Sequence, residues 1–270
     1  MYAPLISLLL ATSMAQVPNE AAIDKLHFAE GFENGDLLDR GFYDGNGKFA
    51  LVDDAAEGRK SLEYRFEKGK IQPSGSDGIR HQFEPGESLY VRFRMKLSPN
   101  WKWTGRPYGP HLFTFMTTEN DRLHGPAASR LTVYVEPVDG RLRLAAQDIQ
   151  NRDAPHGLTQ GPLRGGYNGK FYDSEPLDFE DGKWHLIEAY FRLNTLDMKS
   201  DKPNADGIAR AWFDGKLVVD RNDIVLRSTD YPDMKFNQLL LAPYFHGGVP
   251  EEQWLRIDDL ADGSGRKPNP

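Results

Sequence analysis

The sequence predicts an all-β protein, a two-sheet antiparallel β-sandwich. Short runs of aliphatic and aromatic residues recur along the chain, separated by clusters of Gly, Asp, Asn and Pro. Glycine (26) and proline (18) are plentiful, as a turn-rich β protein requires. No stretch keeps a helical period over a useful length. Many short strands with turn punctuation are typical of antiparallel sandwiches.

The predicted strands share β-branched and aromatic residues and flanking turn signals. They are Leu26–Phe32, Lys48–Val52, Ser61–Phe66, Ser88–Leu97, His111–Thr117, Arg130–Glu136, Arg141–Gln147, Lys183–Asn194, Ile208–Phe213, Lys216–Asp220, Phe236–Phe245 and Trp254–Leu260. Asp139-Gly140 and Asp214-Gly215 are hairpin signals. No linker, composition break or internal repeat divides the chain. We therefore expect a single domain over residues 16–270, with its sandwich from about Leu26 to Leu260.

The N-terminus has the pattern of an export signal. Residues 2–15 form an apolar run that ends in Ser13-Met14-Ala15, with small residues where a cleavage site needs them. The run is too short to span a membrane. No Lys or Arg precedes it, and a disordered N-terminus is the alternative. We expect a signal peptide over residues 1–15, a mature chain beginning at Gln16, and a secreted or periplasmic protein.

Composition limits the classes of function. The 270 residues carry a net charge of −7, which argues against nucleic-acid binding as the main task but allows a local basic groove. The chain has no cysteine, which excludes disulfides, cysteine nucleophiles and thiolate zinc sites. Serine elbows, phosphate-binding loops, dinucleotide fingerprints and His-x-x-x-His zinc motifs are all absent from the sequence. We expect a monomer with no membrane span and no nucleic-acid partner.

Several strands carry a mixed basic and aromatic outer face. In Lys183–Asn194 the alternation places Trp184, Leu186, Glu188, Tyr190 and Arg192 opposite a core face. If the similar strands share one sheet, they form a groove that stacks sugar rings and grips carboxylates. The residues expected to bind substrate there are Arg94, Arg130, Tyr134, Glu188, Arg192, Arg210 and Gln238. The alternative is the ordinary solvated face of an antiparallel sheet.

Candidate proton-transfer residues stand at strand ends. Tyr244 and His246 stand at the end of the stretch Phe236–His246, just before two glycines, and share a face with Gln238. His111 opens another strand after a loop rich in Gly and Pro. The alternative for each is a structural hydrogen-bonding role, which is the more common one for a lone His or Tyr.

Three passages resemble a known family. They are Phe32-Glu33-Asn34-Gly35, the Trp184-His185 strand with the later Trp212-Phe213-Asp214-Gly215-Lys216, and Ile257-Asp258-Asp259-Leu260. Their order resembles the concanavalin A-like jelly-roll proteins, and among them secreted polysaccharide lyases of the glucuronan and alginate type. The Glu-x-Asp-x-x-Glu strand of laminarinase-type hydrolases is absent. By resemblance, Glu33 and Asp258 supply oxygens to a structural calcium ion; otherwise both lie in ordinary turns.

These observations predict a lyase that cleaves an acidic, uronic-acid-containing polysaccharide by β-elimination. The reaction needs a group that neutralises the carboxylate, a base and an acid. The candidate catalytic residues are Tyr244, His246, Tyr190, His111 and Arg92. The sequence leaves open which Tyr pairs with which His. A non-catalytic lectin-like domain using the same face, and a glycoside hydrolase with dispersed carboxylates such as Glu188, are the alternatives.

Overall fold

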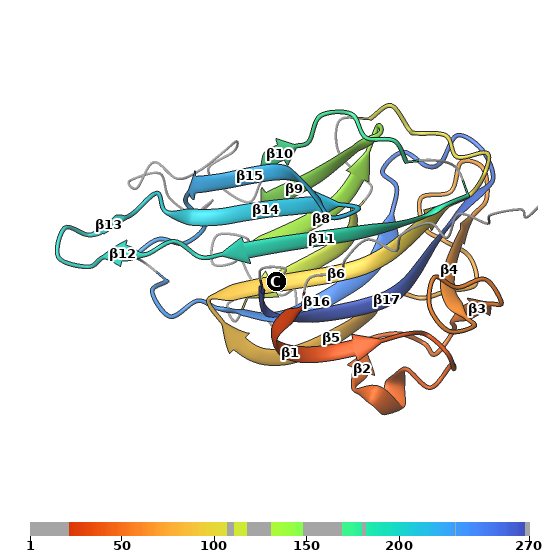
Figure 1. Ribbon diagram of the computed structural model, residues 1–270, viewed down its shortest axis with the longest axis horizontal. Coiled ribbons are helices and arrows are strands. Elements are labelled where there is room, and N and C mark those ends of the chain that lie inside the picture. Colours follow the sequence, from red (N-terminus) through yellow and green to blue (C-terminus); the bar gives the residue numbers. More distant parts are fainter. Residues whose placement is uncertain are drawn as a thin grey trace, which may run out of the picture.

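The computed structural model describes residues 22–106, 111–117, 131–147, 169–179, 182–229 and 231–267. Within these ranges nearly all regular structure is β, and two large antiparallel sheets form a sandwich (Figure 1). The predicted fold class is therefore confirmed. The expected signal peptide and Arg130 lie outside the described residues.

Among the described residues, sheet A contains eight strands. In spatial order they are β15 (Lys216–Ile224), β14 (Gly207–Phe213), β11 (Trp184–Arg192), β6 (Ser88–Leu97), β17 (Gln253–Arg266), β4 (Ser61–Phe66) and β3 (Ala50–Val52), and β1 (Ile23–Glu30) also pairs with β17. The long β17 thus contacts three strands, β1, β4 and β6. It ties the start of the described chain to its end.

Sheet B contains seven strands in the part of the chain that the structure describes. In spatial order they are β10 (Gly169–Asp173), β9 (Arg141–Gln147), β8 (Thr132–Val138), β7 (His111–Thr117), β16 (Phe236–Tyr244), β5 (Ile79–Gly86) and β2 (Phe42–Tyr43). A separate two-stranded ribbon joins β12 (Leu196–Asp197) to β13 (Lys202–Pro203), and η1 (Leu38–Arg40) is one short 3₁₀ turn.

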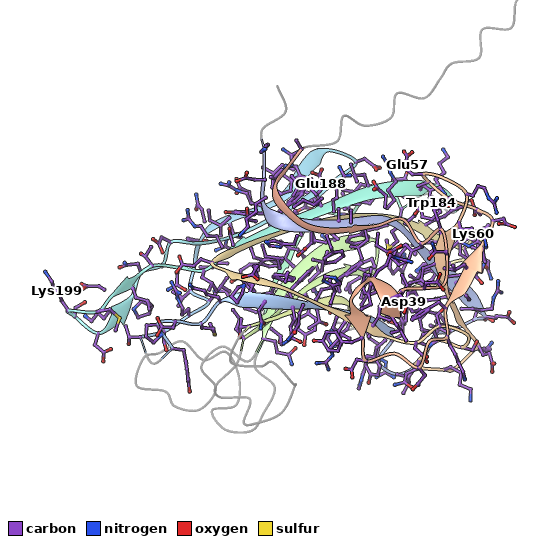
Figure 2. All side chains as sticks on the ribbon, turned by 90° about the horizontal axis from the view of Figure 1, so that it is seen from below. Asp39, Glu57, Lys60, Trp184, Glu188 and Lys199 are labelled. Carbon is purple, nitrogen blue, oxygen red and sulfur yellow. The ribbon has the colours of Figure 1, made fainter. Side chains whose placement is uncertain are left out.

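The core lies between the sheets and follows the predicted alternation. Val91 and Phe93 of β6 and Ile187 of β11 are fully buried on the inner face of sheet A. Phe113 of sheet B meets Phe93 across the interface, with ring centroids 4.3 Å apart. Burying one such side chain stabilises the fold by about 1.5–3 kcal/mol. Figure 2 shows side chains filling the space between the two layers.

The largest departures from the predicted strands concern β5, β10 and β17. β5 and β10 lie in stretches where the sequence predicts no strand. β17 continues past Leu260 to Arg266, through residues that look like a loop. These segments are polar or rich in glycine, and they become strands because a neighbouring strand accepts their backbone hydrogen bonds.

The expectation that the basic, aromatic strands share one sheet is wrong. β6 and β14 belong to sheet A, whereas β8 and β9 belong to sheet B. Arg92 and Tyr190 do lie on one outer face. β6 pairs directly with β11, and Arg92 lies opposite Glu188. Tyr190 is two residues from Glu188 on the same strand, so its side chain points to the same side. Alternation tells which face of a strand points outward, but it does not tell which sheet receives the strand.

Candidate functional site

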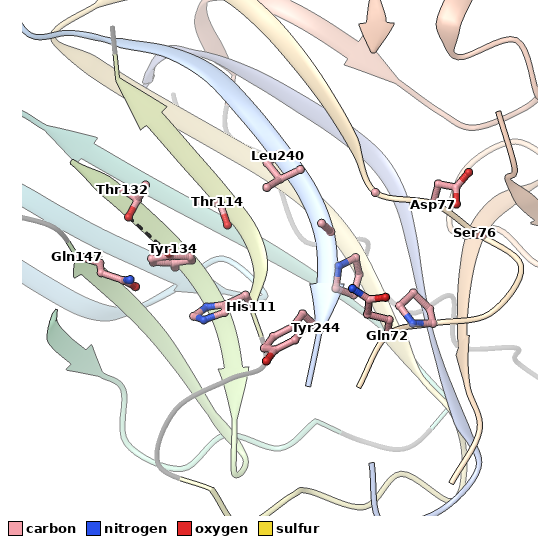
Figure 3. A pocket seen from close by; sticks show the side chains of 14 residues that line it. Gln72, Ser76, Asp77, His111, Thr114, Thr132, Tyr134, Gln147, Leu240 and Tyr244 are labelled. Atoms are coloured by element: carbon pink, nitrogen blue, oxygen red, sulfur yellow. Dashed lines mark hydrogen bonds between the residues drawn. The ribbon is translucent and has the colours of Figure 1, made fainter. Parts of the chain in front are cut away.

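A groove opens on the outer face of sheet B. The first of its two cavities, of about 490 Å³, is lined by residues of β7, β8, β9 and β16 and by a loop over residues 72–78. Figure 3 shows Gln147, Tyr134, His111 and Tyr244 following one another across neighbouring strands. The groove therefore gathers an amide, two phenols and an imidazole on one rigid surface.

His111 lies between two tyrosine rings. Its ring centroid is 4.5 Å from that of Tyr134 and 6.0 Å from that of Tyr244, and the Tyr244 ring is nearly parallel to it at 11°. The strand register brings His111 of β7 opposite Tyr244 of β16. Packing on both sides fixes the imidazole, so that it meets a ligand in one orientation.

A buried carboxylate holds the His111 ring. His111 Nδ1 contacts Oε1 of Glu136, a β8 residue that is only 1% exposed. Burial raises the pKa of Glu136, while the contact with His111 lowers it. With Nδ1 engaged by Glu136, Nε2 is the ring nitrogen left for chemistry, because the partner of one nitrogen sets the role of the other.

Tyr244 is held at the end of β16. Its hydroxyl lies 3.2 Å from Nδ1 of His246, which gives the phenol a neighbour able to exchange a proton. The chain turns sharply just afterwards, and Gly248 has φ +82°. A Cβ there would lie 2.3 Å from the backbone oxygen of Gly69, so only glycine fits. The tight approach positions Tyr244 against the 67–74 loop.

Gln147 completes the polar side of the groove. It pairs with Thr132 across β9 and β8, and its Oε1 is buried with no hydrogen-bond partner in the described ranges. The Thr132 hydroxyl donates to the Tyr134 hydroxyl at 3.4 Å. A buried amide oxygen without a partner suits a site that awaits a polar ligand. Gln147 and Glu136 each occupy an outward position in the alternation of their strands, but no motif in the sequence singles them out.

The groove continues along the 67–74 loop. A second cavity of about 570 Å³ shares Gln72, Pro73 and Tyr244 with the first and adds Lys70. Tyr244 therefore stands where the two cavities meet. The shape suits an extended chain better than an isolated small molecule.

The structure divides the residues predicted from sequence. His111, Tyr134 and Tyr244 line the sheet B groove, and His246 contacts Tyr244. Gln238 also belongs to sheet B, but it is fully buried and accepts a hydrogen bond from Tyr43 at 3.3 Å. The residues on sheet A, away from this groove, are Arg92, Arg94, Glu188, Tyr190, Arg192 and Arg210.

Acidic partners balance the basic residues of sheet A. Arg92 lies 3.6 Å from Asp259, and Arg210 lies 2.7 Å from Asp220. The predicted combination of Arg92 and Tyr190 with His111 and Tyr244 in a single groove is therefore wrong. The two pairs lie on opposite faces of the sandwich, because the strands that carry them belong to different sheets.

Glu33 and Asp258 contact the same short segment, residues 56–60. Glu33 Oε1 accepts the amide of Arg59 at 2.8 Å, and Asp258 Oδ2 accepts the amide of Ala56 at 2.7 Å. Burial raises the pKa of Asp258, and the Glu33 charge adds to that rise. Calcium prefers hard oxygen ligands, and two carboxylates that repel each other are ligands of that kind. Both carboxylates nevertheless already accept hydrogen bonds from backbone amides.

The described residues also bear on metal binding and on membrane insertion. Over these ranges, no three His, Cys, Asp or Glu side chains gather as a metal-binding group. No helix in the same ranges is long and apolar enough to cross a membrane.

Comparison with known proteins supports the fold. No protein-family model matches the sequence, and no curated protein matches it. An alginate lyase from Chlorella virus matches with a TM-score of 0.63 at 14% identity, over 90% of this chain and 100% of that one. The alginate lyase Aly36B, in complex with alginate trisaccharide, matches with 0.60 at 14%, over 91% and 100%. An endo-β-1,4-glucuronan lyase from Trichoderma reesei matches with 0.53 at 15%, over 92% and 94%.

These matches show that the chain has the jelly-roll fold of the polysaccharide lyases that its sequence resembles. At such low identity they show the fold alone. A laminarinase from Flavobacterium shares the fold too, with a TM-score of 0.51 at 14% identity, over 88% of this chain and 100% of that one. The chemistry must therefore be argued from the groove itself.

Proposed function

We propose that this protein is a polysaccharide lyase that cleaves a uronic-acid-containing chain by β-elimination in the sheet B groove. The observation that carries the proposal is the His111 ring, fixed between Tyr134 and Tyr244 and bound through Nδ1 to the buried Glu136. A nitrogen base beside a phenol, at the junction of two cavities, is the arrangement that this reaction needs.

The reaction moves two protons. A base removes the proton from the carbon that bears the carboxylate, and the electron pair forms a carbon–carbon double bond. The glycosidic C–O bond breaks, and its oxygen takes a proton from an acid. His111 Nε2 acts as the base and the Tyr244 hydroxyl as the acid, and His246 returns a proton to Tyr244. Each well-positioned proton transfer contributes about 10²–10⁴-fold in rate.

The substrate carboxylate must be neutralised as charge develops next to it. Gln147 lines the cavity and can turn its amide N–H groups towards that carboxylate. The buried, unpartnered Oε1 of Gln147 would then bind a substrate hydroxyl or a water molecule. We assign Gln147 to carboxylate binding and Tyr134 to stacking beside His111.

The hydrolase alternative has less support. A retaining or inverting hydrolase needs two carboxyl groups flanking the bond to be cut. Among the described residues that line the first groove cavity, Asp77 is the one acidic residue. Its Oδ2 already accepts the backbone amide of Asn46 at 3.0 Å. Glu188, considered from sequence, lies on sheet A at 1% exposure. A binding domain without catalysis remains the second candidate.

The test is Tyr244→Phe, which keeps the ring and removes only the hydroxyl. We expect the absorbance of unsaturated uronic ends to rise with the parent protein on a panel of polyuronates. Turnover by the variant should fall by at least about a hundredfold, with binding largely kept. Full lyase activity in the variant would remove Tyr244 from the mechanism. Binding by the parent without unsaturated ends on any polymer would favour the binding domain.

A further inference from the structure

A second concave region lies on the outer face of sheet A. It has a volume of about 680 Å³ and is lined by residues of β11, β14 and β17, among them Tyr190, Trp212 and Arg266. None of its lining residues belongs to the sheet B groove. Figure 2 shows Glu188, which neighbours this region, in the same layer as Trp184. Because this region is on the outer face of sheet A and the groove is on the outer face of sheet B, the two lie on opposite faces of the sandwich.

Arg266 is held in place on two sides. Its Nε donates to Glu188 Oε1 at 2.9 Å, and its guanidinium carbon lies 4.6 Å from the centre of the Trp212 ring. Glu188 is itself fixed, because it accepts the hydroxyl of Tyr90 at 2.6 Å and is 1% exposed. The guanidinium is thus oriented before any ligand arrives.

The two terminal nitrogens of the Arg266 guanidinium are available to a ligand. Its two terminal nitrogens make no hydrogen bond within the part of the chain that the structure describes, while Nε does. A planar guanidinium with both terminal nitrogens open binds a carboxylate through two parallel hydrogen bonds. Because its orientation is already fixed, little further ordering is required on binding.

The neighbouring side chains suit the rest of an acidic sugar. Arg210, bonded through Nε to Asp220 at 2.7 Å, lines the same cavity, as do the half-exposed Lys267 and Asp24, whose Nζ and Oδ1 atoms lie 3.9 Å apart. Tyr190 pairs with Arg210, and Glu188 pairs with Trp212, so Tyr190 and Trp212 are diagonal neighbours, about 7–8 Å apart. Aromatic rings that alternate with cations fit sugar rings that carry carboxylates.

We propose that this sheet A region is a second, non-catalytic binding site for an acidic polysaccharide, with Arg266 as its carboxylate anchor. The choice of ligand class rests on the proposed function, but binding here does not require catalysis. A long chain held on this face would raise the local concentration of substrate near the groove on the other face.

The experiment counts bound oligosaccharides. Oligoalginates and oligoglucuronans of defined length are titrated calorimetrically into the Tyr244→Phe variant, which slows cleavage of the probe. Arg266→Lys is then added; it keeps a charge for Glu188 but loses the planar fork. Arg210→Gln disrupts only an exposed ion pair and is the second variant should Arg266→Lys fold poorly. Arg221→Gln is the matched control, since Arg221 pairs with Asp223 at 2.8 Å outside both cavities.

We expect Arg266→Lys to remove one binding event per chain and Arg210→Gln to weaken that event about fivefold. Arg221→Gln should change neither, and the event should weaken as salt rises. Arg266→Lys alone should leave turnover of short oligosaccharides unchanged.

Unchanged stoichiometry and affinity in both variants would overturn the second site, even if the protein is an active lyase. Equal binding of neutral laminari-oligosaccharides would overturn its acid specificity. An inactive parent whose binding still depends on Arg266 would refute the proposed lyase and leave this inference standing.

Discussion

Asp262 offers a quantitative test of how a buried charge affects the stability of the sandwich, because its carboxyl group is buried with few polar partners. It lies on β17 at 0% exposure, and neither carboxylate oxygen has a hydrogen-bond partner among the described residues. The group that faces it is His27, whose Nδ1 lies 3.3 Å from Oδ1. Burial raises the pKa of Asp262 to about 6, while His27 opposes the rise.

The sign of the effect follows from that pKa. The native state holds the Asp262 proton more tightly than the unfolded chain does, so the stabilisation by the neutral acid is complete below about pH 4. It is lost as the pH rises through about 6. A rise of about two pKa units corresponds to roughly 3 kcal/mol. The unfolding free energy should therefore fall by up to that amount between these pH values.

Asp262→Asn removes the charge and keeps the shape. Urea unfolding followed by tryptophan fluorescence should show the variant matching the parent near pH 4 and exceeding it by about 1–3 kcal/mol at pH 7.5. Asp223→Asn is the control, because Asp223 is exposed and its pKa is lowered by Arg221. A variant less stable than the parent at pH 7.5 would refute the reasoning and make His27–Asp262 a stabilising ion pair.

Three further predictions concern the groove and the chain ends. Glu136→Gln should lower kcat on polyuronates by at least about a hundredfold with little change in KM, because His111 loses the carboxylate that orients it; full turnover would count against that role. We propose that calcium binds at Glu33 and Asp258. Adding calcium to chelator-treated protein should then raise Tm, and Glu33→Gln should abolish the rise. An unchanged Tm, together with no metal in elemental analysis, would contradict calcium binding. We also propose export, and mass spectrometry of secreted protein should find Gln16 as the first residue, whereas an intact N-terminus in the cells would contradict cleavage.

Local patterns in the sequence were enough to predict the sandwich. Alternation in Ser88–Leu97 and Lys183–Asn194 gave the buried faces of β6 and β11 and pointed Arg92 and Tyr190 outward, each on its own strand. Turn residues marked most strand ends. These features depend on neighbours in sequence, where side-chain direction repeats every two residues. The polar β5 was missed, because its neighbours in the sheet rather than its own residues make it a strand.

The candidate residues were predicted one at a time, and their grouping was not. His111, Tyr134 and Tyr244 stood out as aromatic or titratable residues on strands, but their stacking comes from the order β8, β7, β16 in sheet B. Glu136, which holds His111, looked like one more outward-facing acid.

The sequence by itself determined which residues face outward and what chemistry they carry. Only the tertiary structure decided which of the two sheets receives each strand. That choice separates Arg92 and Tyr190 from His111 and Tyr244, because the two outer faces of a sandwich point in opposite directions. Strand pairing joins residues far apart in the chain and depends on the whole set of strands, so no local pattern encodes it.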